Sequence, residues 1–67
     1  MITLEYSARQ DCFHISTLDA ILKINIRNTI NKVDNDYKIV GLFETQQEAS
    51  KMAEKLRKKQ EEVDKKD

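Results

Sequence analysis

The 67-residue chain has no proline or tryptophan, and it contains only one cysteine, one histidine and one glycine. With a single cysteine it cannot form an internal disulfide, and its length allows one domain at most. Lysine and arginine number twelve, as do aspartate and glutamate, so the net charge is zero. Because non-specific nucleic-acid affinity comes mainly from positive charge, this balance argues against a dominant phosphate-binding surface. Neither a signal peptide nor an apolar run long enough to span a membrane is present, so we expect a cytoplasmic protein.

The residues able to carry catalysis or bind a metal are few and poorly placed. Cys12 and His14 form a Cys-x-His pair, but a tetrahedral zinc site needs about four ligands, so only a site shared between protomers would remain. Asp34 and Asp36 resemble the start of a calcium loop that lacks the required glycine and glutamate. No nucleophile has a base in attack geometry beside it. We therefore predict a protein that is not an enzyme and carries no cofactor.

The strongest pattern is a strand followed directly by a capped helix. Residues 37–43, YKIVGLF, are rich in β-branched, aromatic and aliphatic side chains, which predicts a buried strand. Thr45 and Glu48 form a capping box, in which the threonine hydroxyl accepts from the Glu48 amide and the Glu48 carboxylate accepts from the Thr45 amide. The helix should therefore begin at Gln46. Its apolar positions have the three- and four-residue spacing of one helical face and are Ala49, Met52, Ala53, Leu56 and Val63.

Both faces of the predicted strand carry apolar side chains. Alternation places Ile39 and Phe43 on one face and Val40 and Leu42 on the other. A single helix covers only one face, so the second face is either covered by something else or exposed. Gly41 marks either a β-bulge or a close approach of the helix at residues 52–53. We assign the protein interface to the second face and to the part of the helix beyond its own core, at Val40, Leu42, Leu56 and Val63.

The N-terminal residues predict a hairpin. Residues 1–7 alternate, with Ile2, Leu4 and Tyr6 facing the core and the polar residues between them facing solvent. Residues 8–11 suit a turn, and residues 12–16 form the returning strand, with Phe13 and Ile15 facing inward. The prediction is a half-buried pair of strands.

Residues 17–33 fit two structures. An apolar stripe that includes Leu18, Ile21 and Ile26 suits a helix over residues 17–32, with Ser16 or Thr17 as its cap. The same stretch also alternates as a strand, and its Ile, Asn and Thr residues are poor to middling helix formers. We favour a short turn or helical piece at residues 17–20 followed by a strand at residues 21–31. The helix stays open as the alternative.

A sheet that binds nucleic acid is the second function hypothesis. In a hairpin formed by residues 21–31 and 37–43, one polar face would carry Lys23, Asn25, Arg27 and Lys38. Residues 41–49, GLFETQQEA, follow the pattern G-x-F-x-T-x-x-E-A, which resembles the strand–helix junction of the arm-binding domains of tyrosine integrases and of plant ethylene-response DNA-binding domains. In those families a three-stranded antiparallel sheet packs on one helix and enters the major groove. The resemblance implies that fold here and a sheet that binds DNA.

Together these patterns predict an α+β domain over residues 1–60, with a small antiparallel sheet of three or four strands packed on one long C-terminal helix. Residues 61–67 are expected to form a charged, frayed tail. The first function hypothesis is a small non-enzymatic protein-interaction module that forms a homo-oligomer or docks on a larger protein. The Ile-, Asn-, Lys- and Asp-rich composition suits a bacterial, phage or plasmid source, and a mobile-element protein that binds a host factor fits this hypothesis.

Overall fold

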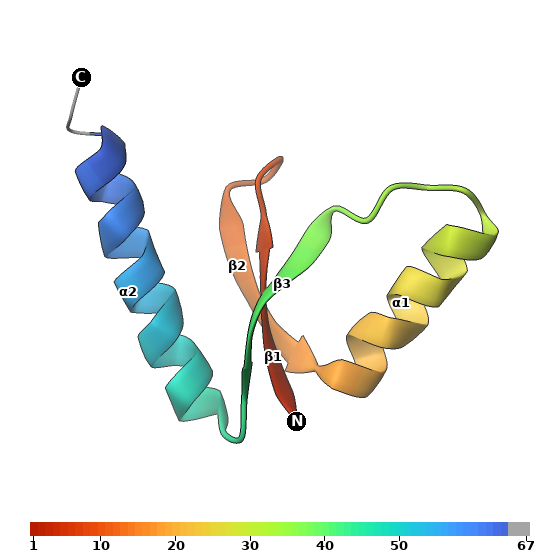
Figure 1. Ribbon diagram of the computed structural model, residues 1–67, viewed down its shortest axis with the longest axis horizontal. Helices are drawn as coiled ribbons and strands as arrows, with labels where there is room; N and C mark the ends of the chain where they lie inside the picture. The colour runs from red at the N-terminus through yellow and green to blue at the C-terminus, as the bar shows by residue number, and fades with distance from the viewer. Residues whose placement is uncertain (65–67) are drawn as a thin grey trace.

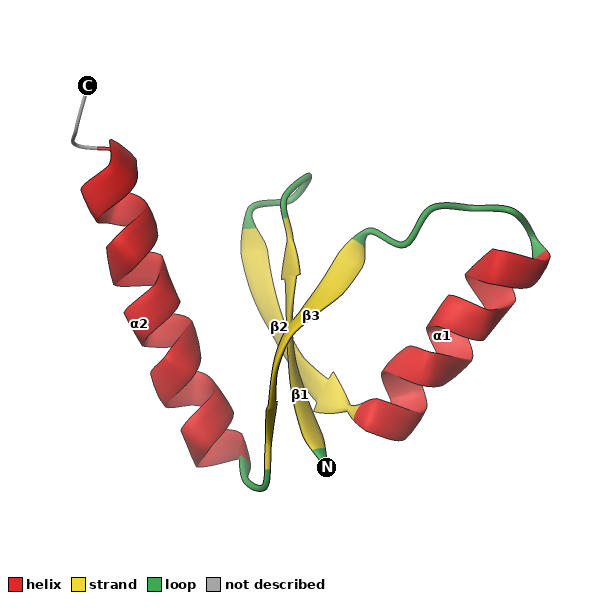
Figure 2. Ribbon diagram, viewed as in Figure 1, coloured by secondary structure: helices red, strands yellow, loops and turns green. Residues whose placement is uncertain are grey.

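The computed structural model describes residues 1–64, which form three strands and two helices. In chain order they are β1 (Ile2–Ser7), β2 (Cys12–Thr17), α1 (Leu18–Ile30), β3 (Tyr37–Phe43) and α2 (Gln46–Asp64). The strands form one antiparallel sheet in the order β2-β1-β3, so β1 is the central strand (Figure 1, Figure 2). The predicted α+β class, with an antiparallel sheet and a long C-terminal helix, is confirmed.

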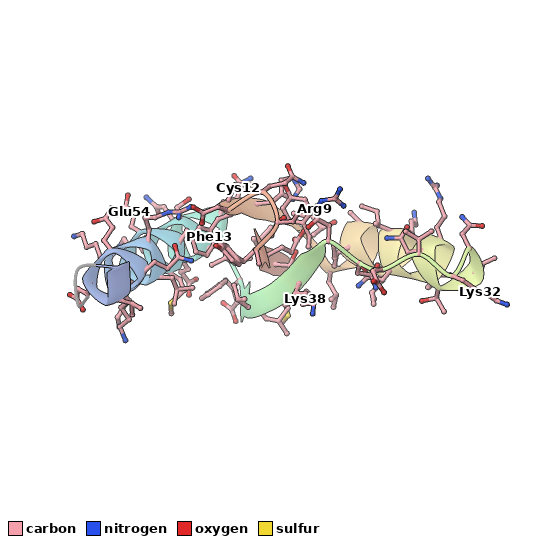
Figure 3. All side chains as sticks on the ribbon, turned by 90° about the horizontal axis from the view of Figure 1, so that it is seen from above. Arg9, Cys12, Phe13, Lys32, Lys38 and Glu54 are labelled. Atoms are coloured by element: carbon pink, nitrogen blue, oxygen red, sulfur yellow. The ribbon has the colours of Figure 1, made fainter. Side chains whose placement is uncertain are left out.

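The two helices lie on opposite sides of the sheet, which is seen between them in Figure 1 and again from above in Figure 3. Both helices diverge from the sheet toward their C-terminal ends (Figure 1). The Cα extents are 40 × 29 × 12 Å. The radius of gyration is 13.3 Å, against about 11 Å for a compact chain of this length. Each helix therefore covers the sheet over only part of its own length.

We call the sheet face covered by α2 the α2 face. Leu4 of β1 and Ala49 of α2 are fully buried there. The Tyr6 and Phe13 rings have their centroids 4.8 Å apart, and Leu4 pairs with Ile15 across the two strands. The inward orientation predicted for these strand residues is therefore confirmed. The small side chain of Ala49 lets the first turns of α2 approach the sheet closely.

A β-bulge in β3 changes which residues share a face. The register with β1 shifts midway along β3 and leaves Val40 as the extra residue. Consequently Ile39 and Leu42 share one face, whereas Phe43 lies on the α2 face. The predicted pairing of Ile39 with Phe43 and of Val40 with Leu42 is wrong, because strict alternation fails across a bulge. Gly41 follows the bulge, and its nearest neighbour is the Phe43 ring rather than the helix at residues 52–53.

Residues 18–30 form helix α1, so the favoured strand at residues 21–31 is wrong and the alternative helix is correct. Thr17 caps its start, since its hydroxyl accepts from the Ala20 amide at 3.3 Å. Its end closes in a Schellman motif, in which the two amides after the cap donate to carbonyls of the last turn and Lys32 takes a left-handed φ of 57°. These two closed ends and the burial of Ile21 outweigh the weak helix propensity of the Ile and Asn residues.

Helix α2 begins at Gln46, as predicted. The Glu48 amide donates to Thr45 Oγ1 at 3.2 Å, which is the predicted cap. The reciprocal arm differs, since the hydroxyl of Thr45 rather than its amide donates to the Glu48 carboxylate. The helix continues to Asp64 and so includes the first four residues, 61–64, of the predicted C-terminal tail. The rest of that tail, residues 65–67, lies outside the described residues.

Candidate interaction surface and the cavity beneath helix α1

The other sheet face, which we call the α1 face, is polar and yet buried. Thr3, Glu5 and Ser7 of β1 point to this side, and all three are buried, although the sequence placed them toward solvent. The prediction was wrong because helix α1 lies over β2 and β1 on this side. The sequence analysis had favoured a strand for most of these helical residues, so it left this face of the sheet uncovered. Ile21 is the single buried residue of α1 and is 2% exposed. The helix is therefore held on the sheet by very little apolar contact.

Most of the large exposed apolar side chains among residues 1–64 belong to α1 and to its face of the sheet. Leu22, Ile26 and Ile30 are four residues apart and form an exposed stripe along α1. Beside α1, Ile39 and Leu42 of β3 are exposed because the helix covers β2 and β1 more closely. We call these five residues the apolar surface. The three α1 residues lie on the part of the helix turned away from Ile21 and the two β3 residues lie on the sheet, and exposed apolar side chains of this kind make both groups candidates for an interaction site.

A cavity of about 220 Å³ lies between α1 and the sheet. Ile21 and Ile24 of α1 form its apolar wall, and Tyr37 of β3 forms an aromatic wall. No lysine or arginine contributes to the lining, which leaves the cavity with a negative formal charge. The polar part of the lining consists of two carboxylates, one imidazole and three amides, from Glu5, Asp36, His14, Asn25, Asn28 and Asn35.

Glu5 is the most deeply buried charged group of the cavity, with 1% of its surface exposed. Its Oε2 accepts a hydrogen bond from the Thr3 hydroxyl, and its Oε1 lies 3.3 Å from Nδ1 of His14. The His14 side chain is 57% exposed and carries a charge only when protonated. Within the described part of the chain, no lysine or arginine forms a salt bridge with Glu5. A buried carboxylate without a permanent cation is energetically costly, which makes Glu5 a candidate binding group.

Hydrogen bonds on one side of the cavity also shift pKa values. The Ser7 hydroxyl and the Gln10 side-chain amide donate to Asp36 at 2.7 Å each, and these bonds lower the pKa of Asp36. Cys12 Sγ lies 3.3 Å from the Tyr37 hydroxyl, and this contact is the main cause of the raised pKa of Tyr37. The thiol therefore contacts a phenol instead of an imidazole base. Covalent catalysis needs a nucleophile held by a base, and this arrangement does not provide one.

The four residues predicted as the protein interface do not form one surface. Leu42 belongs to the apolar surface and is 51% exposed. Val40 is 47% exposed and borders a hollow with Tyr6 on the opposite side of the sheet. In α2, Leu56 is half-buried and Val63 is exposed near the end of the helix. The apolar stripe of α1 was missed because its residues were assigned to a strand, although their four-residue spacing is a helical signal.

The four residues predicted for nucleic-acid binding are also dispersed. Lys23 and Arg27 are exposed on α1, and Asn25 lines the cavity beneath the same helix. Lys38 pairs with Tyr6 on the α2 face, across the sheet from them. The single polar sheet face expected for these residues does not form, because residues 18–30 are helical.

Helix α2 makes a contact that the sequence did not indicate. Arg57 donates to Oδ1 and to the carbonyl of Asp11 at 3.0 and 3.1 Å, and its guanidinium carbon lies 5.1 Å from the centre of the Phe13 ring. The Tyr6 hydroxyl donates to the same carboxylate, and the bonds from Tyr6 and Arg57 lower the pKa of Asp11. Figure 3 shows Phe13 on the side of the sheet that carries Glu54 of α2. This cluster ties the middle of α2 to the turn between β1 and β2.

Residues 1–64 contain neither a metal-binding cluster nor a membrane-spanning helix. No group of three or more His, Cys, Asp and Glu side chains is placed there to bind a metal ion, and no helix is long and apolar enough to cross a membrane. Compared with protein-family models, curated proteins and solved structures, the chain matches none of them. The resemblance to integrase arm-binding domains remains a prediction, and function has to be inferred from the apolar surface and the cavity.

Proposed function

We propose that this protein is a small non-enzymatic protein-interaction module that docks on its partner through the apolar surface of α1 and β3. The observation that supports this proposal is the exposure of Leu22, Ile26, Ile30, Ile39 and Leu42 around a helix with one buried residue. Full burial of such a side chain contributes about 1.5–3 kcal/mol. Because these five are already partly covered, a partner that buries them gains on the order of 5 kcal/mol before the costs of association.

The free edge of β3 adds to the same surface. The strand order β2-β1-β3 gives β3 one neighbour in the sheet, so its other edge has unpaired backbone groups. A strand of the partner that paired there would lie beside Ile39 and Leu42 and would add main-chain hydrogen bonds to the apolar contact. Strand addition and burial of the apolar surface are therefore compatible in one complex.

A second copy of the chain is the first partner to test. The zero net charge means that two copies do not repel each other overall. A chain of this length also has a small core, and such domains often gain stability by association. A larger protein with an apolar segment is the other partner that the same surface would accept.

The test is the absolute molar mass in solution, measured by light scattering on the wild type, Leu42→Glu and Ile26→Glu. Val40→Glu is the matched control, since Val40 and Leu42 have nearly equal exposure, 47% and 51%, on opposite sides of the sheet. We expect a wild-type mass of twice the 7.9 kDa of one chain. Leu42→Glu and Ile26→Glu should give folded monomers, and Val40→Glu should remain a dimer. A dimer that only Val40→Glu dissociates would place the interface on the α2 face and refute the proposal.

A monomeric wild type would direct the search to a different protein partner. In that case the dye ANS, which binds exposed apolar surface, distinguishes an open surface from a closed one. We expect ANS fluorescence with the wild type and with Val40→Glu, and a clear loss with Leu42→Glu. A monomer with no ANS fluorescence would show that the surface is not available in solution and would refute the proposal.

A further inference from the structure

We propose that the outer side of α1 binds an acidic amphipathic helix of the partner protein. This inference rests on the proposed function and specifies the chemistry of the segment that lies on α1. We define the outer side by the apolar stripe Leu22, Ile26 and Ile30 and by the two cations beside it, Lys23 and Arg27. It is turned away from the one buried residue of the helix, and no other described element lies beyond α1 there (Figure 1).

The positive charge on the outer side has no partner within the described part of the protein. A shallow hollow there is lined by two cations, two isoleucines and one amide, from Lys23, Arg27, Ile26, Ile30 and Asn31. No carboxylate contributes to this lining, because the exposed Asp19, one turn before Lys23, lies outside it. Within residues 1–64, neither Lys23 nor Arg27 forms a salt bridge. Carboxylates of a partner therefore reach both cations without breaking an existing ion pair.

The apolar part of the hollow favours a protein over a nucleic acid as the ligand. Ile26 and Ile30 are 58% and 74% exposed, and they lie between and beside the cations in the same hollow. A phosphate backbone would neutralise the cations but would leave the isoleucines against a charged and hydrated surface. An amphipathic protein segment provides both parts, since its carboxylates pair with the cations while its apolar side chains bury the isoleucines.

The spacing of these residues favours a helix over an extended segment. Lys23 and Arg27 are four residues apart, as are Leu22, Ile26 and Ile30, and four residues of an α-helix rise about 6 Å. The outer side therefore presents two neighbouring rows with the same repeat, and rows of this kind interdigitate when two helices pack. An extended segment would bring unpaired backbone groups to a helix whose own backbone groups are already paired. A helix with glutamates four residues apart beside an apolar row matches both rows.

The experiment is a titration of the ¹⁵N-labelled full chain with two synthetic peptides, followed by amide chemical shifts. Both peptides are helical, about 16 residues long, and carry the same row of leucines. Glutamates flank this row in the acidic probe, and lysines flank it in the matched control. We expect saturable shifts at residues 22–31 with the acidic probe, weakened by added salt, and none with the control. The titration is run on the wild type and on Leu42→Glu, in which α1 stays uncovered if the wild type is a dimer.

Charge reversal on the protein supplies the second arm of the test. Lys23→Glu combined with Arg27→Glu should reverse the preference, so that the lysine peptide binds and the acidic probe does not. Lys51→Glu combined with Lys55→Glu is the matched control, because these exposed cations of α2 are also four residues apart, and it should leave binding of the acidic probe unchanged. Ile30→Asn should weaken that binding at least tenfold, and the high exposure of Ile30 makes loss of the fold unexpected.

Several outcomes would overturn the inference. These are equal binding of the two peptides, binding of neither, or equal losses from the two charge-reversed pairs. Shifts at residues 22–31 with a DNA duplex or with phosphatidylglycerol vesicles, and not with the acidic probe, would assign the outer side to that ligand instead. A homodimer in the molar-mass series without binding of the acidic probe to either chain would overturn this inference alone and leave the proposed function standing.

Discussion

Gly41→Ala tests how the strand β3 is built, because two opposing effects of the substitution can be separated. Gly41 has a negative φ, so alanine is compatible with the backbone there. Replacing glycine by alanine at such a position stabilises a protein by about 0.4–1 kcal/mol, because the unfolded chain loses conformational freedom. If nothing contacted the new methyl group, Gly41→Ala would therefore raise the free energy of unfolding.

The Phe43 ring reverses that sign. A Cβ at residue 41 would lie 2.6 Å from Cε2 and 2.8 Å from Cζ of Phe43, whereas carbon atoms in contact prefer about 3.5–4.0 Å. Overpacking of this kind costs about 1–3 kcal/mol. The net expectation is a loss of about 1 kcal/mol. With a urea m-value of about 1 kcal/mol/M for so small a domain, the unfolding midpoint should fall by about 1 M.

The assay is urea unfolding followed by far-UV circular dichroism, with Phe43→Val as the background for a double-mutant cycle. Valine keeps an apolar, β-branched residue in the strand and lacks the ring atoms that the methyl group would meet. In that background Gly41→Ala should become neutral or stabilising, with a coupling energy of about 1–3 kcal/mol. An equal loss of stability in both backgrounds would refute the assignment of the effect to the Phe43 ring.

Three further substitutions test the rest of the fold by urea or acid unfolding. Lys32→Gly should stabilise the chain by about 0.5–1 kcal/mol, because a left-handed φ costs an L-residue about 1–2 kcal/mol and the added freedom of glycine offsets only part of that gain. No gain would contradict the left-handed end of α1. Ile21→Ala should destabilise by about 2–4 kcal/mol and broaden the amide signals of α1, since it removes the one buried residue of that helix. Unchanged α1 signals would contradict this anchoring role. Asp36→Asn should make the free energy of unfolding less sensitive to acid. The pKa of Asp36 is lowered in the folded state, so its ionised carboxylate stabilises the fold above the ordinary pKa of 3.8. This stabilisation is lost as the pH falls through the folded pKa. An identical acid-unfolding curve for Asp36→Asn would refute it.

The sequence predicted correctly those features that are determined by residues close together in the chain. The start of α2 follows from Thr45 and Glu48, whose spacing places a hydroxyl near an orphan amide whatever the rest of the chain does. The inward residues of β1 and β2 follow from alternation, because no bulge interrupts that pair. Where the cause is confined to a few neighbouring residues, the sequence is enough.

The predictions that were wrong concern features that depend on contacts between residues far apart in the sequence. The bulge at Val40 is set by the pairing of β3 with β1, and the alternation of apolar residues in β3 carries no sign of it. Helix α1 ends at Ile30, and the left-handed residue after its cap is Lys32, where a glycine would have indicated this end from the sequence. The cavity and the buried Glu5 arise only when α1 folds back over β1, so an assignment of strand to residues 21–31 removed them from the candidate site. The alternation of Leu22, Ile24 and Ile26 suggested that strand, and those side chains are exposed.

The two faces of the sheet are covered by their helices in different ways. On the α2 face, Leu4 and Ala49 are fully buried and Arg57 ties the helix to the turn. On the α1 face, Glu5 is buried and Ile26 is exposed. Burying a carboxylate and exposing a large apolar side chain both cost free energy of folding. If the proposed partner covers the apolar surface, its docking would offset the cost of exposing these apolar side chains.

The size of that effect is set by linkage. A partner present at 100 times its dissociation constant adds about 2.7 kcal/mol to the free energy of unfolding. A chain of this length is expected to have roughly 3–10 kcal/mol in total. A partner would therefore supply a large share of the stability of α1, the element held by the least contact. If the proposed partner binds there, the position of α1 on the sheet and the occupancy of its surface would be coupled, because Ile21 is the one buried residue that anchors the helix.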